Sequence, residues 1–338
     1  MAAPLPPGEE GARSRSEWEG EGDRPSAHPH PSAASRLPPS PDGRGTISPA
    51  LLPPLRELGD LKRIRSADAP GSIAERLFRR GWAALARGED AGAVMRRTAA
   101  AALAAARLGD LDRAKLVELG VGDPNAVLRR GFDEVTAEVD PGVAALLRPA
   151  LGEGAPEGGP TPLFVELLAR QPRAGVTCPG RPRLMLQPAE NHAEHCLMVA
   201  VYGVVLSAAY GADPTEVFVA GMAHHLHNAP MPDAGFTGEV LLGGELDGVI
   251  ARAREAGLAQ LDAPVREYVA AALAPISGEA TREARAFHAA DVIDRVLEIE
   301  QHARGNVRMD VVLGEYELVH AGPVKAFHDR VLGEVGLL

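Results

Sequence analysis

The sequence predicts an all-α fold, and three observations lead to this prediction. Of the 338 residues, 45% are hydrophobic and only 4% are aromatic, so Ala, Leu and Val supply most of the core. Small and aliphatic faces suit helix packing better than β-sandwiches, which are rich in Tyr, Trp and Phe. From residue 72 onward, apolar side chains recur at helical spacing between Gly, Asp and Pro punctuation.

The first segment, residues 1–68, lacks this pattern. It is crowded with Pro, Gly, Ser and mixed charges, and no apolar period of 3.6 or 2 survives in it. Such a segment buries too little apolar surface to offset its ordering entropy. We predict a disordered tail.

A helical module is expected over residues 70–150. Ser72 and Glu75 stand at capping-box spacing before an apolar stripe, and a second helix follows Asp90 and runs to about Leu108. Further short helices are expected at 110–119, 124–138, 141–150 and 161–170. The module contains no histidine and no catalytic cluster, which leaves docking or homo-oligomerisation as hypotheses for its role.

The expected second domain spans residues 176–338, after a linker and a short helix over 152–175. Asn191 and Glu194 form a capping box for a helix that ends at Gly211. The next helix starts at Asp213 and Pro214 and closes at Pro230. A long helix is expected over 279–303, and a last one starts near Pro323.

Charge and composition exclude several classes of protein. The net charge of −11 argues against broad nucleic-acid binding, while a local arginine cluster or a metal can still attract a small anion. The two cysteines form no CxxC pair, which favours a reducing compartment. The sequence has no run of about 18 apolar residues, and Pro and Glu stand where a signal peptide needs an apolar region. We therefore expect a cytoplasmic protein without a membrane span.

Histidines gather in the second half of the chain. Five of the 11 fall in two short stretches: His192, His195, His224, His225 and His227. His195 lies in the first turn of one predicted helix and His224 near the end of the next. Antiparallel neighbours bring such positions level. Asp291, among small and apolar residues of a third helix, would complete a site for a divalent transition metal with a position left for water.

These residues resemble a known pattern. The order His195, then His224-His225, then Ala290-Asp291 is similar to the H…HD…D motif of the HD superfamily of metal-dependent phosphohydrolases. In its nucleotidase-like branch, which includes bacterial 5′-deoxynucleotidases, an Arg and a Leu-Met pair precede an E-N-x-x-E-H stretch. This chain has Arg181-Pro182-Arg183-Leu184-Met185 and then Glu190-Asn191-His192-Ala193-Glu194-His195. The resemblance covers roughly residues 175–305.

The resemblance implies an HD-like helical bundle and assigns roles to individual residues. The implied metal ligands are His195, His224, His225 and Asp291, with His225 in place of the Asp of the HD dipeptide. The substrate-binding candidates are Arg181, Arg183 and Glu194. The catalytic candidates are His227, Asn228 and Asp233. Asn228 stands where the branch has a catalytic Glu, and His227 is the candidate replacement base, since an amide takes no proton at neutral pH.

The leading functional hypothesis is a metal-dependent hydrolase of a small phosphorylated compound, with a nucleotide as one candidate and Mn, Co, Ni, Fe or Zn as the metal. His225 and Asn228 favour one alternative, a catalytically inactive HD fold that binds a metal or ligand for regulation. A further alternative is an iron-dependent oxygenase on the same scaffold. Arg295, four residues after Asp291, offers a competing interpretation, in which it pairs with Asp291 and holds it away from a metal.

Overall fold

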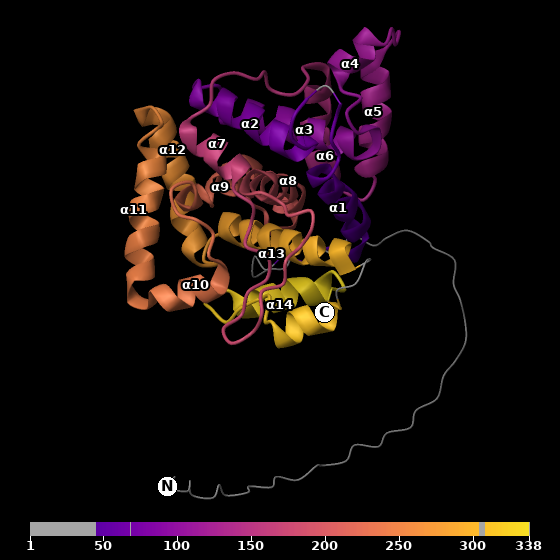
Figure 1. The fold of residues 1–338 in the computed structure, drawn as a ribbon. Helices are drawn as coiled ribbons and strands as arrows, with labels where there is room; N and C mark the ends of the chain where they lie inside the picture. Colours follow the sequence, from indigo (N-terminus) through magenta and orange to yellow (C-terminus); the bar gives the residue numbers. More distant parts are fainter. Residues whose placement is uncertain (1–44, 68, 304–307, 338) are drawn as a thin grey trace, which may run out of the picture. The chain divides into compact units, whose positions relative to one another are not determined.

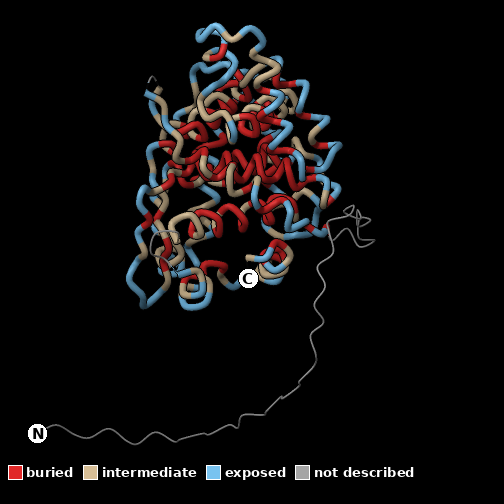
Figure 2. The backbone as a smooth tube through the Cα atoms, turned by 90° about the vertical axis from the view of Figure 1, so that its right-hand side faces the viewer, coloured by how far each residue is buried: buried red, intermediate tan, exposed pale blue. Residues whose placement is uncertain are grey.

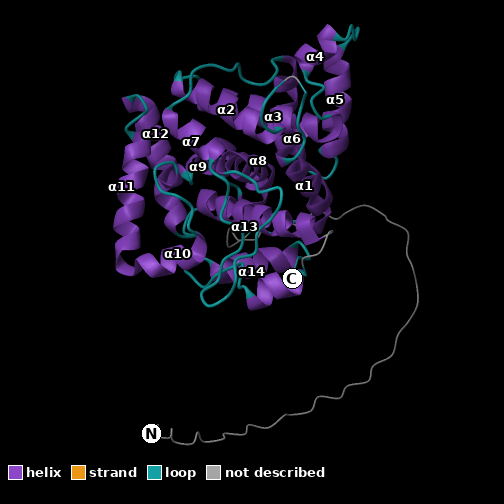
Figure 3. Cartoon of the chain, in the orientation of Figure 1, coloured by secondary structure: helices purple, strands orange, loops and turns teal. Residues whose placement is uncertain are grey.

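The computed structural model describes residues 45–67, 69–303 and 308–337. Within these ranges the regular elements are helices, with three isolated β-bridges and no strand (Figure 3). The predicted all-α class is therefore confirmed. Most of the predicted disordered tail, residues 1–44, lies outside the described residues.

The first half of the described chain carries seven α-helices. They are α1 (Leu52–Gly59), α2 (Ile73–Ala86), α3 (Ala91–Leu108), α4 (Arg113–Glu118), α5 (Pro124–Val135), α6 (Pro141–Leu147) and α7 (Leu163–Arg170). The second half carries seven more. These are α8 (His192–Tyr210), α9 (Pro214–Ala223), α10 (Gly235–Leu242), α11 (Leu246–Leu258), α12 (Ala263–Leu273), α13 (Arg282–Ala303) and α14 (Lys325–Glu334).

Local capping signals place several of these helices where the sequence predicts them. Ser72 accepts the backbone N–H of Glu75 at the start of α2. At α8 the capping box forms in both directions between Asn191 and Glu194, and Gly211 ends the helix in the left-handed region at φ 61°. These signals act within one turn of chain, so the sequence alone suffices to locate them.

The predicted tail boundary at residue 68 is wrong, because the chain is helical well before it. A short 3-10 turn (Pro49–Leu51), α1 and a second 3-10 turn (Asp60–Lys62) precede α2. Their leucines form one buried stripe: Leu51, Leu52, Leu55, Leu58 and Leu61. The prolines that masked this stripe stand at the start of α1, where a missing N–H costs nothing.

The sequence analysis also assigned no helix between Pro230 and residue 279, where α10, α11 and α12 lie. None of the residues of α10 is buried, and α11 buries only three. A helix with so little buried surface has no apolar face to reveal its period in the sequence.

Helix α8 is the centre of the core. It is buried along almost its whole length, packing against α9 and α13 and against α2 and α7 from the first half (Figure 1). Buried residues gather in the middle of the described chain (Figure 2). Among the described residues α8 is the one helix long and apolar enough to cross a membrane, but 89% of it is buried within the protein. Its apolar composition is thus that of a central core helix.

The expected separation into a module over 70–150 and a domain over 176–338 is wrong. The described residues form one compact unit, and one continuous hydrophobic core includes side chains from both halves. The Trp82 indole of α2 donates to the Met222 carbonyl of α9 at 3.3 Å. The segment over 152–175, predicted as a linker, therefore joins two parts of one domain, because α2 and α3 pack against α8 and α9.

Two glycines bring α8 and α9 close together. A Cβ on Gly221 would lie 2.6 Å from the Ala200 Cα, and one on Gly203 would lie 2.4 Å from a Val217 methyl. At both positions there is room for the glycine hydrogen but not for a methyl group. This close approach sets the separation of side chains near the start of α8 and the end of α9.

Candidate metal centre

His195 and His224 meet at the junction of α8 and α9. Their Nε2 atoms lie 3.2 Å apart, and the Asp291 Oδ1 atom of α13 lies 3.3 Å from the Nε2 of His195. Both imidazoles are buried, and Asp291 is nearly so. The structure thus brings together the three residues that the sequence analysis placed on three separate helices.

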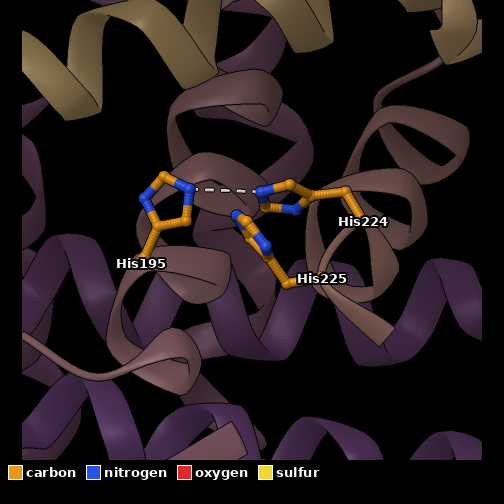
Figure 4. A group of neighbouring side chains, drawn as sticks. All are labelled: His195, His224 and His225. Carbon is orange, nitrogen blue, oxygen red and sulfur yellow. Dashed lines mark hydrogen bonds between the residues drawn. The ribbon is translucent and has the colours of Figure 1, made fainter. Parts of the chain in front are cut away.

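His225 joins this group from the turn after α9. Each of the three histidines offers a ring nitrogen, and these atoms lie within 4.8 Å of one another. Figure 4 shows the three rings facing one another. The ring centre of His225 lies 4.3 Å from that of His224 and 5.1 Å from that of His195. Adjacent residues share the site because the helix ends at Ala223, so helical geometry does not separate them.

Each of the three rings has an acceptor at its Nδ1 atom. The Nδ1 of His195 lies 2.7 Å from Asp294 Oδ2, and that of His224 lies 2.7 Å from the Gly221 carbonyl. The Nδ1 of His225 lies 2.6 Å from the Asn228 Oδ1 atom. Hydrogen bonds of this kind fix the imidazole tautomer and leave Nε2 as the atom that can bind a cation.

Burial keeps the histidines of α9 and its following turn neutral. It lowers the pKa of His224 to about 3, and the neighbouring His195 adds to this effect. Burial also holds the pKa of His225 well below its ordinary value. The uncharged rings of His224 and His225 keep nitrogen lone pairs available within the histidine group, and the Asp291 carboxylate lies beside His195, which favours a cation there.

The three ring nitrogens lie within 4.8 Å of one another, which allows one metal ion to lie among them, and Asp291 adjoins this group through His195. Neighbouring ligands at the usual metal–ligand distance of 2.0–2.1 Å lie about 2.9–3.4 Å apart in octahedral or tetrahedral geometry. The distances of 3.2 Å and 3.3 Å fall in this range. The donor set of imidazoles and one carboxylate suits divalent transition metals.

Asp291 faces both His195 and Arg295. One carboxylate oxygen lies 3.3 Å from His195, while the other lies 3.9 Å from the Arg295 guanidinium. Burial raises the pKa of Asp291, but the hydrogen bond with His195 and the charge of Arg295 outweigh it and hold the pKa well below its usual range. Arg295 also donates to the Leu318 carbonyl at 2.6 Å. It therefore does not withdraw Asp291 from the histidines.

The sequence analysis missed Asp294 and the group behind it. Asp294 is fully buried and contacts the ammonium of Lys62 as well as His195. Lys62 follows α1, in the segment assigned to the tail. The leucine stripe of α1 was the available signal that this segment folds, and no local signal linked Lys62 to the histidines.

A cavity of about 550 Å³ opens beside the histidines. His224, His225 and Asp291 line it, together with three arginines, Arg173, Arg254 and Arg295. Apolar side chains of α11, α12 and α13 form another part of the wall, and the rings of Phe236 and His320 stack at 3.6 Å. The cavity is large enough for a small organic molecule.

The predicted substrate-binding residues lie away from this cavity. Arg181 pairs with Glu315 at 3.1 Å on the surface, and Arg183 donates to the Ala174 and Ala234 carbonyls. Glu194 is buried as the capping partner of Asn191. These three assignments are not supported by the geometry, since ion pairing, loop bonding and helix capping account for the side chains.

The three catalytic candidates differ in their position relative to the cavity. Asn228 and Asp233 line the cavity, but the Asn228 side chain serves His225, and Asp233 accepts the backbone N–H groups of Ala174 and Gly235. His227 is not among the lining residues. Burial and the nearby Arg254 lower the pKa of His227 to about 4, which makes it a weak base.

Comparisons of the chain with protein-family models, with curated proteins and with solved structures found no match.

Proposed function

We propose that this protein is a metal-dependent hydrolase of a small phosphorylated compound, of the HD phosphohydrolase type that its motif order resembles, acting in the cytoplasm. One observation carries the proposal. Three imidazoles present ring nitrogens within 4.8 Å of one another, with Asp291 of α13 beside His195, at the wall of a cavity that also contains arginines.

The proposed ligands are His195, His224, His225 and Asp291, and the ion is Mn, Co, Ni, Fe or Zn in its divalent form. Such an ion supplies a Lewis acid and lowers the pKa of a water molecule bound to it. The chain itself orients the ligands through the Nδ1 hydrogen bonds. Asn228 orients His225 in this way, so its amide has a role that requires no proton transfer.

Arg254 is the proposed anchor for the phosphate. It lines the cavity, and among the described residues no carboxylate lies within 4.0 Å of it. Its Nε atom is buried without a hydrogen-bond partner. Arg173 and Arg295 also line the cavity, but each already faces a carboxylate, Glu190 and Asp291. An arginine without a counter-ion has its full charge available for a bidentate contact with phosphate.

Glu239 is the proposed proton donor to the leaving group. It lines the cavity from α10, and burial together with the charge of Asp233 raises its pKa. A carboxyl group with a raised pKa retains its proton closer to neutral pH, as a general acid requires. This assignment replaces His227, whose pKa is too low for efficient proton uptake.

Metal analysis and a phosphatase screen test the proposal together. We expect about one transition-metal ion per wild-type chain, and turnover of at least one small phosphate ester with Mn²⁺, Co²⁺, Ni²⁺, Fe²⁺ or Zn²⁺. His224→Ala should lose both. His227→Ala is the matched control for metal content, because it removes a nearby imidazole that is not a ligand. Equal, substoichiometric metal in wild type and His224→Ala would refute the proposal.

The role of Asn228 in holding His225 favours a second candidate, a metal-binding regulatory protein without catalysis. That protein would retain its metal and turn over no ester in the screen. The carboxylate and imidazole set is also compatible with an iron-dependent oxygenase. Substrate-dependent oxygen consumption by the Fe²⁺-loaded protein, with no phosphate release, would identify that activity.

A further inference from the structure

A second cluster of charged side chains lies directly behind His195. The Lys62 ammonium stands among three carboxylates, at 2.7 Å from Glu190, 2.9 Å from Asp294 and 3.0 Å from Glu298. All four side chains are buried, and that of Asp294 has no exposed surface. Glu190, His195 and Asp294 alone would resemble a metal site, but the lysine supplies the cation.

The balance of charge in this cluster depends on Lys62. Arg63 pairs with Glu298 at 2.6 Å and Arg173 with Glu190 at 3.3 Å, but the ion pairs of Asp294 within the described chain are with Lys62 and His195 alone. Removal of the lysine would leave three buried carboxylates facing one another without their common partner. Their mutual repulsion would displace Asp294, the residue with no other cation.

Asp294 connects this cluster to the metal centre. One of its oxygens lies 2.7 Å from the Nδ1 of His195, while both contact Lys62, at 2.9 Å and 3.1 Å. Carboxylates that accept the second ring hydrogen of a ligating histidine orient the ring and strengthen it as a ligand. Whatever fixes Asp294 therefore also fixes the Nε2 of His195.

We infer that Lys62 is a positioning residue for the metal centre and acts through Asp294 on His195. The inference rests on the proposed metal site and adds the N-terminal segment, residues 47–63, to its machinery. Docking of this segment and metal binding are then coupled, and by linkage each strengthens the other to the same extent.

The segment is held in place independently of Lys62. The leucine stripe of α1 is buried in the common core, and the Tyr202 hydroxyl of α8 donates to the Leu55 carbonyl at 2.7 Å. Arg56 pairs with Glu300 of α13 through two hydrogen bonds. These contacts allow Lys62 to be changed while the segment stays docked, and Arg56 offers a control that lies two turns away.

The test is a Co²⁺ titration of full-length variants, followed by the visible absorption of the bound ion. Lys62→Met keeps the length of the side chain and removes its charge. We expect about 10–100-fold weaker Co²⁺ binding and a changed absorption band, the loss typical of partners behind a ligating histidine. Arg56→Met, which breaks an ion pair of the same segment without touching Asp294, should bind Co²⁺ within about twofold of wild type.

A double-mutant cycle separates positioning from general loss of structure. Asp294→Asn should also weaken binding, and Lys62→Met should add little to it in the Asp294→Asn background, because both changes break one chain of contacts. Additive losses, or unchanged affinity and spectrum in Lys62→Met, would overturn the inference. If Lys62→Met fails to fold, the contrast between Asp294→Asn and Arg56→Met decides, and equal affinities overturn the inference.

These outcomes are distinct from those that bear on the proposed function. Wild-type protein that binds Co²⁺ tightly, with Lys62→Met equal to it, removes the role of the lysine and leaves the metal site in place. Wild-type protein that binds no Co²⁺ removes both.

Discussion

Two clusters of charged and ionisable groups lie on opposite sides of the His195 ring, and they differ in one respect. At Nδ1, buried carboxylates surround the ammonium of Lys62, so the chain supplies its own cation. At Nε2, His224 and Asp291 approach with a nitrogen lone pair and a negative charge, and no ammonium of the described residues lies between them. The comparison teaches that convergence of ligands alone does not define a metal site. The candidate metal site is the cluster in which the described chain places no ammonium among the ligand atoms, while Arg295 lies 3.9 Å from the second Asp291 oxygen.

The largest effect is expected at His195, the residue that belongs to both clusters. His195→Ala removes a metal ligand and one hydrogen-bond donor of buried Asp294. We expect metal affinity to fall by more than about 100-fold and the free energy of unfolding to fall by about 2–4 kcal/mol. His225→Ala leaves the contacts of Asp294 and Lys62 intact, so it should lower affinity with a smaller cost in stability. Calorimetric metal titration and urea denaturation measure the two effects, and wild-type affinity in His195→Ala would contradict the comparison.

The next effect concerns the glycine that lets α9 approach α8. Gly221→Ala places a methyl group about 2.6 Å from the Ala200 backbone, so the helices must separate. We expect a loss of about 1–3 kcal/mol in the free energy of unfolding, and weaker metal binding because His224 moves with α9. Gly333→Ala in α14, where a Cβ would meet nothing within 4 Å, is the control. If both variants match wild type in thermal unfolding, helix approach does not set the site.

Acid should act on the metal centre before it acts on the carboxylate cluster. In the metal-free protein the pKa of His224 is about 3, below its unfolded value of about 6.5. The unfolded chain therefore binds a proton between these values while the native state does not, and stability falls as the pH falls below 6.5. His224→Gln should flatten this slope by about 1 kcal/mol per pH unit between pH 6 and 5.

The carboxylates respond later, because Lys62 lowers the pKa of Asp294 and of Glu298 against the effect of burial. Their contribution is complete above their unfolded pKa of about 4 and is lost as the pH falls below it. Chemical denaturation with chelator present, from pH 8 to pH 4, measures the loss of stability that we assign to His224. If the free energy of unfolding has the same slope against pH in His224→Gln and in wild type, that assignment is wrong.

The smallest effect is expected outside both clusters. Arg181 forms an exposed ion pair with Glu315, so Arg181→Ala should change the free energy of unfolding by less than about 0.5 kcal/mol. It should also leave KM unchanged for any ester found in the screen.

Arg254→Ala should raise that KM about tenfold or more, since no carboxylate partner offsets the charge of Arg254 in the cavity. Steady-state kinetics of the two variants compare them, and the reverse ranking would return the phosphate contact to Arg181.

Local signals explain how much of the fold and site could be predicted. The caps Ser72, Asn191 and Gly211 act within a turn, and burial of an entire apolar helix marks α8 from composition. His195, His224 and Asp291 could be grouped because each lies at a definite position in such a helix. Helices with little buried surface, such as α10, carry no comparable signal and were missed.

The sequence by itself determined the helical class, the helices with strong caps and the three side chains that meet at the candidate metal centre. Only the tertiary structure decided which arginines face the cavity, that both halves share one core, and that Lys62 stands behind His195. The physical reason is the separation along the sequence over which each kind of contact acts. Caps and periodicity depend on neighbours within a few residues, whereas the contact between Lys62 and Asp294 joins positions 232 residues apart and exists only once α1 has packed against α8 and α13.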